Sequence, residues 1–139
     1  MKKTILLLLA ILLTGQASIQ AGPIIIIANR DVPAGELSFD EVQRIFLGKM
    51  TTWRDGRKIV PVCLKGGTTH AAFLRSYLDM NPTQFDIFWK QAVFTGTGRP
   101  PKALANETDV IQAVKGTPGS IGYIDSDTLR GTLKIIDVN

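Results

Sequence analysis

The 139-residue sequence has little sulfur, little imidazole and few aromatic rings. It contains one cysteine and one histidine, which excludes a disulfide framework and a zinc cluster built from these residue types. Aromatic residues make up 7% of the chain and charged residues 20%, whereas 45% of the residues are hydrophobic. This balance is typical of a globular protein and excludes intrinsic disorder and collagen-like structure. The length suits one domain with its own hydrophobic core.

The first 21 residues have the three parts of a secretory signal peptide. Lysines at positions 2 and 3 precede an apolar run at 4–13, and small and polar residues follow up to Ala21. The apolar run is about half as long as the roughly twenty residues that a membrane-spanning helix needs. We therefore expect residues 1–21 to be a signal peptide, cleaved after Ala21 or after Ala17. A retained membrane anchor is the less favoured alternative.

The remaining domain, residues 22–139, is expected in the periplasm, without a membrane span. Without the leader it has 14 basic and 12 acidic residues, so the net charge falls from +4 to about +2. No run of lysine and arginine of the kind that binds nucleic acid remains, and we expect no nucleic-acid partner. Cys63 is expected to be a buried, apolar side chain and not a reactive thiol.

Hydrophobic patterns predict one small α/β domain, a mixed sheet flanked by helices. The unbroken isoleucine run at 24–27 is typical of a strand that is covered on both faces. Ser38 with Glu41 forms a capping box, and Asn81 with Pro82 marks a second helix start. The expected elements are a strand at 23–29, a helix at 38–47, a strand at 59–63, helices at 68–78, 82–93 and 106–115, and strands at 121–124 and 132–138.

The apolar residues of the expected helix at 82–93 recur at helical spacing, so we predict that they belong to the core and not to a cofactor site. They are Phe85, Phe88, Trp89, Ala92 and Val93.

Motifs of catalysis are missing from the sequence. It has no nucleophile elbow, no metalloprotease helix, no phosphate-binding Walker loop and no dinucleotide-binding glycine pattern. His70 falls in the first turn of an expected helix, where we predict a surface side chain. We expect no catalytic residue, no bound metal and no cofactor. An enzyme that uses His70 or Cys63 is the least favoured hypothesis.

One segment has the chemistry of an anion site. Gly66, Gly67, Thr68 and Thr69 lie between an expected strand and helix, where free amides point outward at the positive end of the helix dipole. Lys65 adds a positive charge nearby. The competing interpretation is a tight turn in which a threonine caps the helix. Arg99, between Gly98 and Pro100, is either a second anion contact or part of a loop salt bridge.

Several segments, in the same chain order, resemble the phosphate-binding proteins of ABC transporters over residues 37–125. The most specific are the Ile-Phe-x-Gly-Lys motif at 45–49 and the Pro-Gly-x-Ile-Gly-Tyr motif at 118–123. The stretch Phe94–Pro101 is similar to one in short exported members of this family. The other segments are Leu37-Ser38-x-x-x-Val42, Trp53-x-Asp55-Gly56, Ile59-x-Pro61-Val62, Thr68-Thr69-x-x-x-Phe73 and Phe88-Trp89.

The resemblance implies one lobe of the type II periplasmic-binding-protein fold and a phosphate or other small oxyanion as ligand. The anion loop of the family reads Arg-x-x-Gly-Ser-Gly-Thr. Aligned on Phe73, its threonine falls on Thr69 and its first glycine on Gly66. Cys63 then stands at the arginine position and Gly67 at the serine position, so the expected phosphate affinity is low.

These observations favour an exported, non-enzymatic binding module that resembles one lobe of a phosphate receptor, with weak or altered ligand binding. The alternative is a structural or interaction protein of the periplasm, which keeps the lobe but binds a protein partner or a second copy of itself.

Overall fold

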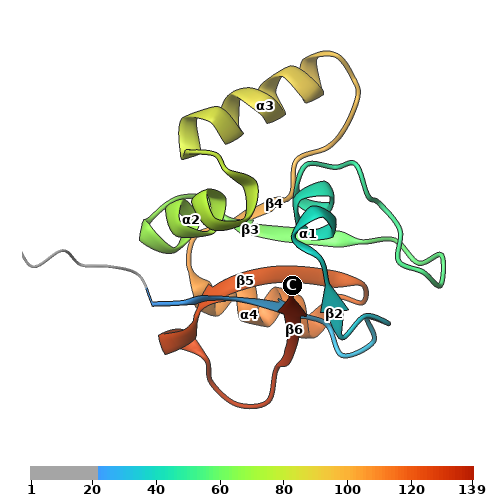
Figure 1. Ribbon diagram of the computed structural model, residues 1–139, viewed down its shortest axis with the longest axis vertical. Helices are drawn as coiled ribbons and strands as arrows, with labels where there is room; N and C mark the ends of the chain where they lie inside the picture. Colours follow the sequence, from blue (N-terminus) through green and yellow to red (C-terminus); the bar gives the residue numbers. More distant parts are fainter. Residues whose placement is uncertain (1–21) are drawn as a thin grey trace, which may run out of the picture.

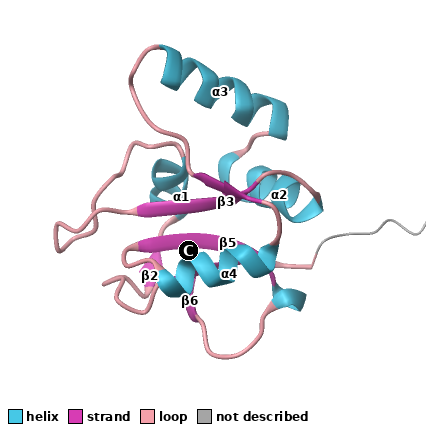
Figure 2. Ribbon diagram, turned by 180° about the vertical axis from the view of Figure 1, so that it is seen from behind, coloured by secondary structure: helices cyan, strands magenta, loops and turns pink. Residues whose placement is uncertain are grey.

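The computed structural model describes residues 22–139, so the expected signal peptide at 1–21 lies outside the described residues. Six strands form one sheet in the order β2-β6-β1-β5-β3-β4, with helices on both of its faces (Figures 1 and 2). The strands are β1 (Ile24–Ala28), β2 (Glu36–Leu37), β3 (Val60–Leu64), β4 (Lys102–Leu104), β5 (Ser120–Asp125) and β6 (Lys134–Val138). The helical segments are α1 (Phe39–Phe46), α2 (Thr68–Phe73) with its π-helical continuation η1 (Leu74–Leu78), α3 (Pro82–Phe94), α4 (Glu107–Gly116) and the 3-10 turn η2 (Ser126–Thr128).

The sheet is mixed, as the sequence predicts. Strand β1 pairs in antiparallel fashion with β5 and β6, whereas β3 runs parallel to both β5 and β4. Within β1, Ile26 and Ile27 are fully buried, which fits a central strand covered on both faces. The short edge strands β2 and β4 are absent from the sequence-based prediction, because two or three residues carry no readable alternation.

Neighbouring residues of β5 show how the two layers of helices are held. Gly122 faces α4, where its missing side chain leaves room for Val110 and Val114. The next side chain, Tyr123, points to the other face and stacks on Phe73, with ring centroids 3.8 Å apart. Alternation along one strand therefore packs α4 on one face of the sheet and the helical segment that starts with α2 on the other.

The helix starts agree with the sequence signals. The Ser38 hydroxyl accepts a hydrogen bond from the Glu41 amide, while the Glu41 carboxylate accepts one from the Ser38 amide. Asn81 forms the same reciprocal pair with Gln84 at the start of α3. These local contacts satisfy amides that a helix leaves unpaired, and they need no tertiary structure.

Helix α3 lies apart from the two layers, beyond the edge of the sheet that β3 and β4 form (Figures 1 and 2). Phe85 and Trp89 are buried as predicted, and a Cβ at Gly48 would lie 2.8 Å from the Trp89 ring. The prediction is wrong for Val93, which is 57% exposed. A helix that meets the body along a narrow line buries one row of side chains and not a wide stripe.

Within residues 22–139, no helix combines the length and the apolar character needed to cross a membrane.

Candidate functional site

The predicted anion loop connects β3 to α2, and its residues Lys65 to Thr68 are exposed. Gly67 has a φ of +94°, a conformation that favours glycine, and it occupies the N-cap position without a side chain that could cap the helix. The N-cap is therefore Gly67 and not a threonine. The first amides of α2 receive no capping side chain, so they keep their capacity to bind an acceptor from outside.

Thr69 differs from the rest of the loop because it is buried. Its hydroxyl donates a hydrogen bond to Glu107 Oε2 at 3.3 Å, and Glu107 Oε1 accepts one from the Asp125 amide at 2.5 Å. A carboxylate from the start of α4 thus lies beside the start of α2. Its negative charge opposes the binding of an anion at this place.

The two cations expected near the loop do not meet there. Lys65 borders a cavity beneath α3. Arg99 follows α3 and lines a separate hollow with Lys58 and Lys102. Within residues 22–139 no hydrogen bond or ion pair joins Arg99 to the anion loop, and the salt bridges of this part involve only Arg44 and Arg57.

His70 lies in the interior, which corrects the prediction of a surface side chain. The residue is 3% exposed, and its Nδ1 lies 2.5 Å from the Tyr123 hydroxyl. That hydroxyl also accepts a hydrogen bond from the Leu64 amide at 3.0 Å. The arrangement that gives the hydroxyl proton an acceptor is donation to Nδ1, which places the proton of the neutral imidazole on Nε2.

Burial sets the protonation states of this cluster. It lowers the pKa of His70 below the usual 6.5, although the nearby Asp86 carboxylate works in the opposite direction. Burial raises the pKa of Tyr123, so the phenol keeps its proton. The signal that could have placed His70 inside is the spacing of Thr69, His70 and Phe73, which all lie on the buried side of α2.

A cavity of about 550 Å³ lies between α3 and the ends of β3 and β4. We call it the α3 pocket; Phe85, Trp89 and Phe94 line it from α3, and Leu64, His70 and Pro101 line it from the facing side.

Cys63 also borders the α3 pocket, and it is buried, as expected from the sequence. Burial, with a smaller contribution from the Asp86 charge, raises the pKa of its thiol to about 12. The thiol is therefore protonated at neutral pH and a poor nucleophile.

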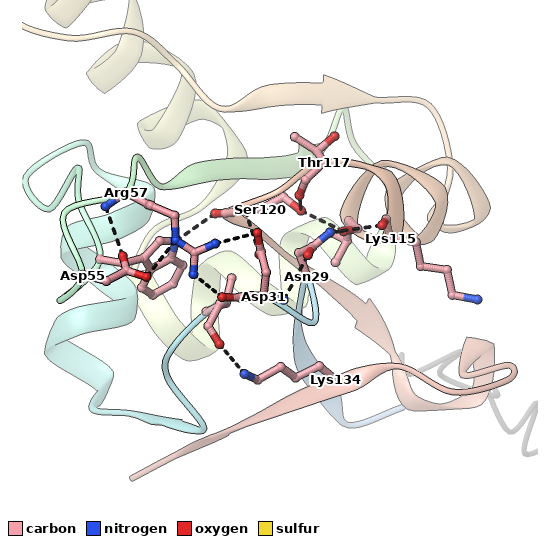
Figure 3. A network of polar contacts seen from close by, with 12 residues as sticks. Asn29, Asp31, Asp55, Arg57, Lys115, Thr117, Ser120 and Lys134 are labelled. Carbon is pink, nitrogen blue, oxygen red and sulfur yellow. Dashed lines mark hydrogen bonds and ion pairs between the residues drawn. The ribbon is translucent and has the colours of Figure 1, made fainter.

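The opposite end of the sheet holds a network of polar contacts that the sequence analysis missed (Figure 3). The Asn29 amide group donates hydrogen bonds to the carbonyls of Val114 and Lys115, at 2.8 and 3.0 Å. The Asp31 carboxylate accepts one from the Gly119 amide at 3.1 Å and pairs with Arg57 at 2.7 Å. This network connects the loop after β1 to the turn before β5.

The Pro-Gly-x-Ile-Gly-Tyr motif lies at this junction and serves packing. Gly119 has a φ of +77°, and a Cβ there would lie 2.4 Å from the Lys58 carbonyl oxygen. The Ser120 hydroxyl donates to the carbonyls of Val114 and Thr117 at the end of α4. The residues that make the family recognisable here are thus residues that hold the fold together.

Within the described part of the chain, no three histidine, cysteine, aspartate or glutamate side chains are grouped in a way that could hold a metal ion.

Comparisons with known proteins agree with this architecture. A family model described as "PBP superfamily domain" matches residues 15–138. No curated protein matches the sequence. Among solved structures, a candidate phosphate ABC transporter substrate-binding protein from Clostridium perfringens, with bound phosphate, is 19% identical with a TM-score of 0.67. That match covers 86% of this chain and 46% of the other.

Two further structures are similar at the same level. PstS from Borrelia burgdorferi is 17% identical with a TM-score of 0.65, over 84% of this chain and 47% of the other. A phosphate-binding protein from Stenotrophomonas maltophilia is 21% identical with a TM-score of 0.60, over 86% and 39%. The chain spans less than half the length of each of these proteins, and identities this low establish the fold alone. The chain belongs to the PBP superfamily domain family and forms a single lobe of the periplasmic-binding-protein fold.

Proposed function

We propose that the chain is an exported, non-enzymatic binding module that holds a small oxyanion weakly at Gly66–Thr69. The observation that carries the proposal is the exposed turn after β3, where the first amides of α2 have no capping side chain. Such amides donate hydrogen bonds to phosphate, sulfate or carboxylate oxygens. Further support comes from solved neighbours of this fold that are described as a phosphate ABC transporter substrate-binding protein with bound phosphate and as a phosphate-binding protein.

Three features make the binding weak. Cys63 stands where the family has an arginine, so Lys65 is the cation nearest to the loop in the sequence. The hydroxyl of Thr69 is already bonded to the Glu107 carboxylate. A single lobe also leaves an anion open to water on one side, so fewer contacts offset the cost of removing its hydration shell.

The protonation states of His70 and Cys63 support a role without catalysis. His70 is neutral and shares a hydrogen bond with Tyr123, and the thiol of Cys63 is protonated. The periplasmic location rests on the signal-peptide pattern of residues 1–21.

Oxyanion binding is tested by thermal unfolding of residues 22–139 with phosphate or sulfate at low ionic strength. A ligand present at its dissociation constant stabilises the fold by about 0.4 kcal/mol, and at one hundred times that concentration by about 2.7 kcal/mol. We expect a rise in Tm at tens of millimolar anion and none at micromolar anion.

Two single substitutions change the charge at the loop in opposite directions. Glu107→Gln removes the opposing negative charge but keeps an acceptor for Thr69 and Asp125, so it should increase the affinity for phosphate. Lys65→Gln should decrease it. Lys115→Gln, at the other end of the sheet, is the matched control and should leave the affinity unchanged. If neither anion shifts the Tm of the wild type or of Glu107→Gln, the oxyanion function is wrong.

A second candidate function, binding of a protein partner, is favoured by the surface of α3. Ile87 is 50% exposed and Phe94 is 91% exposed, and exposed large apolar side chains on a projecting helix are typical of protein contacts. The partner would be a periplasmic protein or a second copy of the chain. Sedimentation of wild type and Ile87→Ser at rising concentration tests the second case: self-association that is lost in the variant supports it, and a monomer at all concentrations contradicts it.

A further inference from the structure

We propose that the α3 pocket binds a small amphipathic carboxylate, whose apolar body packs between α3 and the strand ends and whose carboxylate accepts a hydrogen bond from His70 Nε2. This site is distinct from Gly66–Thr69, none of which lines the pocket, although Lys65 borders it. The proposal therefore goes beyond the oxyanion function and does not depend on it.

The polar end of the ligand follows from the protonation of His70. Its Nδ1 is turned to Tyr123, so the part of the ring that remains for the pocket carries Nε2 and its proton. Within residues 22–139 the one hydrogen bond of the ring is made by Nδ1, and the residue as a whole is 3% exposed. A hydrogen bond from Nε2 to a ligand oxygen would therefore use a donor that has no partner in this part of the chain.

The Trp89 ring also lines the pocket, and its N–H group is unpaired among the described residues. Trp89 is 6% exposed, and its Nε1 has no hydrogen-bond partner in the part of the chain described here. In contrast, Nε1 of the other tryptophan, Trp53, donates to the Gly119 carbonyl at 3.0 Å. Because the Trp89 Nε1 atom is itself buried, the donor that remains for a ligand in the pocket is His70 Nε2.

Charge at the pocket favours an acid over a neutral acceptor. The lysines Lys65 and Lys90 border the pocket, against the single carboxylate of Asp86. Neither lysine takes part in an ion pair within residues 22–139. Two cations at the rim attract an anion, and the His70 donor gives its carboxylate a fixed position.

The apolar walls of the pocket disfavour an inorganic ion as its ligand. Phe85, Phe94 and Pro101 offer no polar side-chain group to replace the hydration shell of phosphate or sulfate, and the indole N–H of Trp89 is buried. An apolar body, by contrast, gains by leaving water, and a volume of about 550 Å³ is in the range of small-molecule sites. The combination selects a molecule that is apolar along its length and acidic at one end.

Octanoate is the probe, and the single histidine of the chain is the reporter. The imidazole Hε1 signal in a proton NMR spectrum belongs to His70 without further assignment. We expect octanoate to shift this signal in a saturable manner and to raise the pKa of His70, because the bound carboxylate stabilises the imidazolium. The charged groups that border the pocket, Lys65, Asp86 and Lys90, are the same with and without ligand. No saturable shift with octanoate overturns the proposal.

Neutral 1-octanol and inorganic phosphate are the matched ligands. Octanoate should bind about tenfold more tightly than octanol, the factor expected from one hydrogen bond to a charged group. Equal affinities would overturn the carboxylate assignment. Phosphate should leave the Hε1 signal in place even if it raises Tm at the anion loop, so failure of one site is distinguishable from failure of the other.

Two variants locate the carboxylate. His70→Phe keeps a ring but loses the donor, so octanoate affinity should fall about tenfold while octanol affinity stays the same. Because this change leaves the Tyr123 hydroxyl without its acceptor, a second variant on the surface is needed. The double variant with Lys65→Gln and Lys90→Gln should fold normally and lose about threefold in octanoate affinity. Unchanged octanoate affinity in both variants would contradict the proposed orientation.

Discussion

The two ends of the sheet use their polar groups differently. At the end where β1 stops and β5 begins, Asn29, Asp31, Arg57 and Ser120 all have partners within the chain (Figure 3). At the end where β3 stops, the first amides of α2 have no capping side chain, and the N–H group of Trp89 has no partner among the described residues. Groups that are already paired stabilise the fold, whereas unpaired donors keep their capacity for a ligand.

The same comparison distinguishes the residues that identify the family from the residues that would bind a ligand. The Pro-Gly-x-Ile-Gly-Tyr motif lies mostly at the end where β1 stops and β5 begins, which we call the paired end; the other end, where β3 stops, is the unpaired end. The last residue of the motif, Tyr123, contacts His70 from inside the sheet. The anion loop, at the other end, departs from the family pattern at Cys63 and Gly67. A chain can therefore keep the residues that specify the lobe while the residues that select the ligand change.

The largest effect is expected from a methyl group at the paired end. Gly119→Ala forces a Cβ against the Lys58 carbonyl at a backbone conformation that favours glycine, so it should destabilise the fold by about 3 kcal/mol and lower Tm by about 10 °C. Gly56→Ala is the matched control: its φ is +84°, but its Cβ would meet no atom within 4 Å. That variant should lose only about 1 kcal/mol. Equal losses in urea unfolding would mean that close packing at Gly119 is not decisive.

A smaller loss is expected from the side chain that joins β1 to α4. Asn29→Ala removes a buried hydrogen bond to the Val114 carbonyl and a partly buried one to the Lys115 carbonyl, so the free energy of unfolding should fall by about 2 kcal/mol. Asn106→Ala removes an exposed cap of α4, and about 1 kcal/mol is expected for it. A loss at Asn29 no greater than the loss at Asn106 would remove the contrast between the two ends.

At the unpaired end, His70 should make the free energy of unfolding depend on pH. Because the pKa of His70 is lower in the folded chain than in the unfolded chain, the unfolded state takes up a proton first as pH falls. The stabilisation from the neutral ring is present above pH 6.5 and is lost as pH falls below that value. Urea unfolding between pH 7 and pH 5 should show this decline, and His70→Gln should flatten it.

Asp55 provides the comparison at the paired end. Hydrogen bonds from the Arg57 backbone and side chain lower the pKa of Asp55 below 3.8, so its contribution is present at neutral pH and is lost only in stronger acid. A decline between pH 7 and pH 5 that persists in His70→Gln would assign the effect to another group.

The smallest effect is expected at the tip of α3. Phe94→Ser changes a side chain that is 91% exposed, so the free energy of unfolding should stay within about 0.5 kcal/mol of the wild type. Phe85→Ala, on the buried row of the same helix, should cost about 3 kcal/mol. A large loss for Phe94→Ser would mean that α3 packs against the body more closely than its exposure indicates.

Features that depend on near neighbours in the chain could be predicted from the sequence. The capping boxes at Ser38 and Asn81 and the isoleucine run of β1 specify helix starts and a central strand, because each is decided by contacts or burial within a few residues. Motif order identified the family and hence the single lobe. The position of the anion loop between β3 and α2 was also predictable, but its occupancy by an oxyanion stays a prediction.

What the tertiary structure decided is the environment of each side chain in the candidate sites. The one histidine is internal because Tyr123, 53 residues away, meets its Nδ1, and Thr69 is engaged because Glu107 arrives from another helix. Helix α3 has the periodicity of a core helix, yet Val93 is exposed because the body meets α3 along one narrow line. Sequence patterns specify which face of an element is apolar; only the packing of distant elements determines whether that face, or a donor on it, finds a partner.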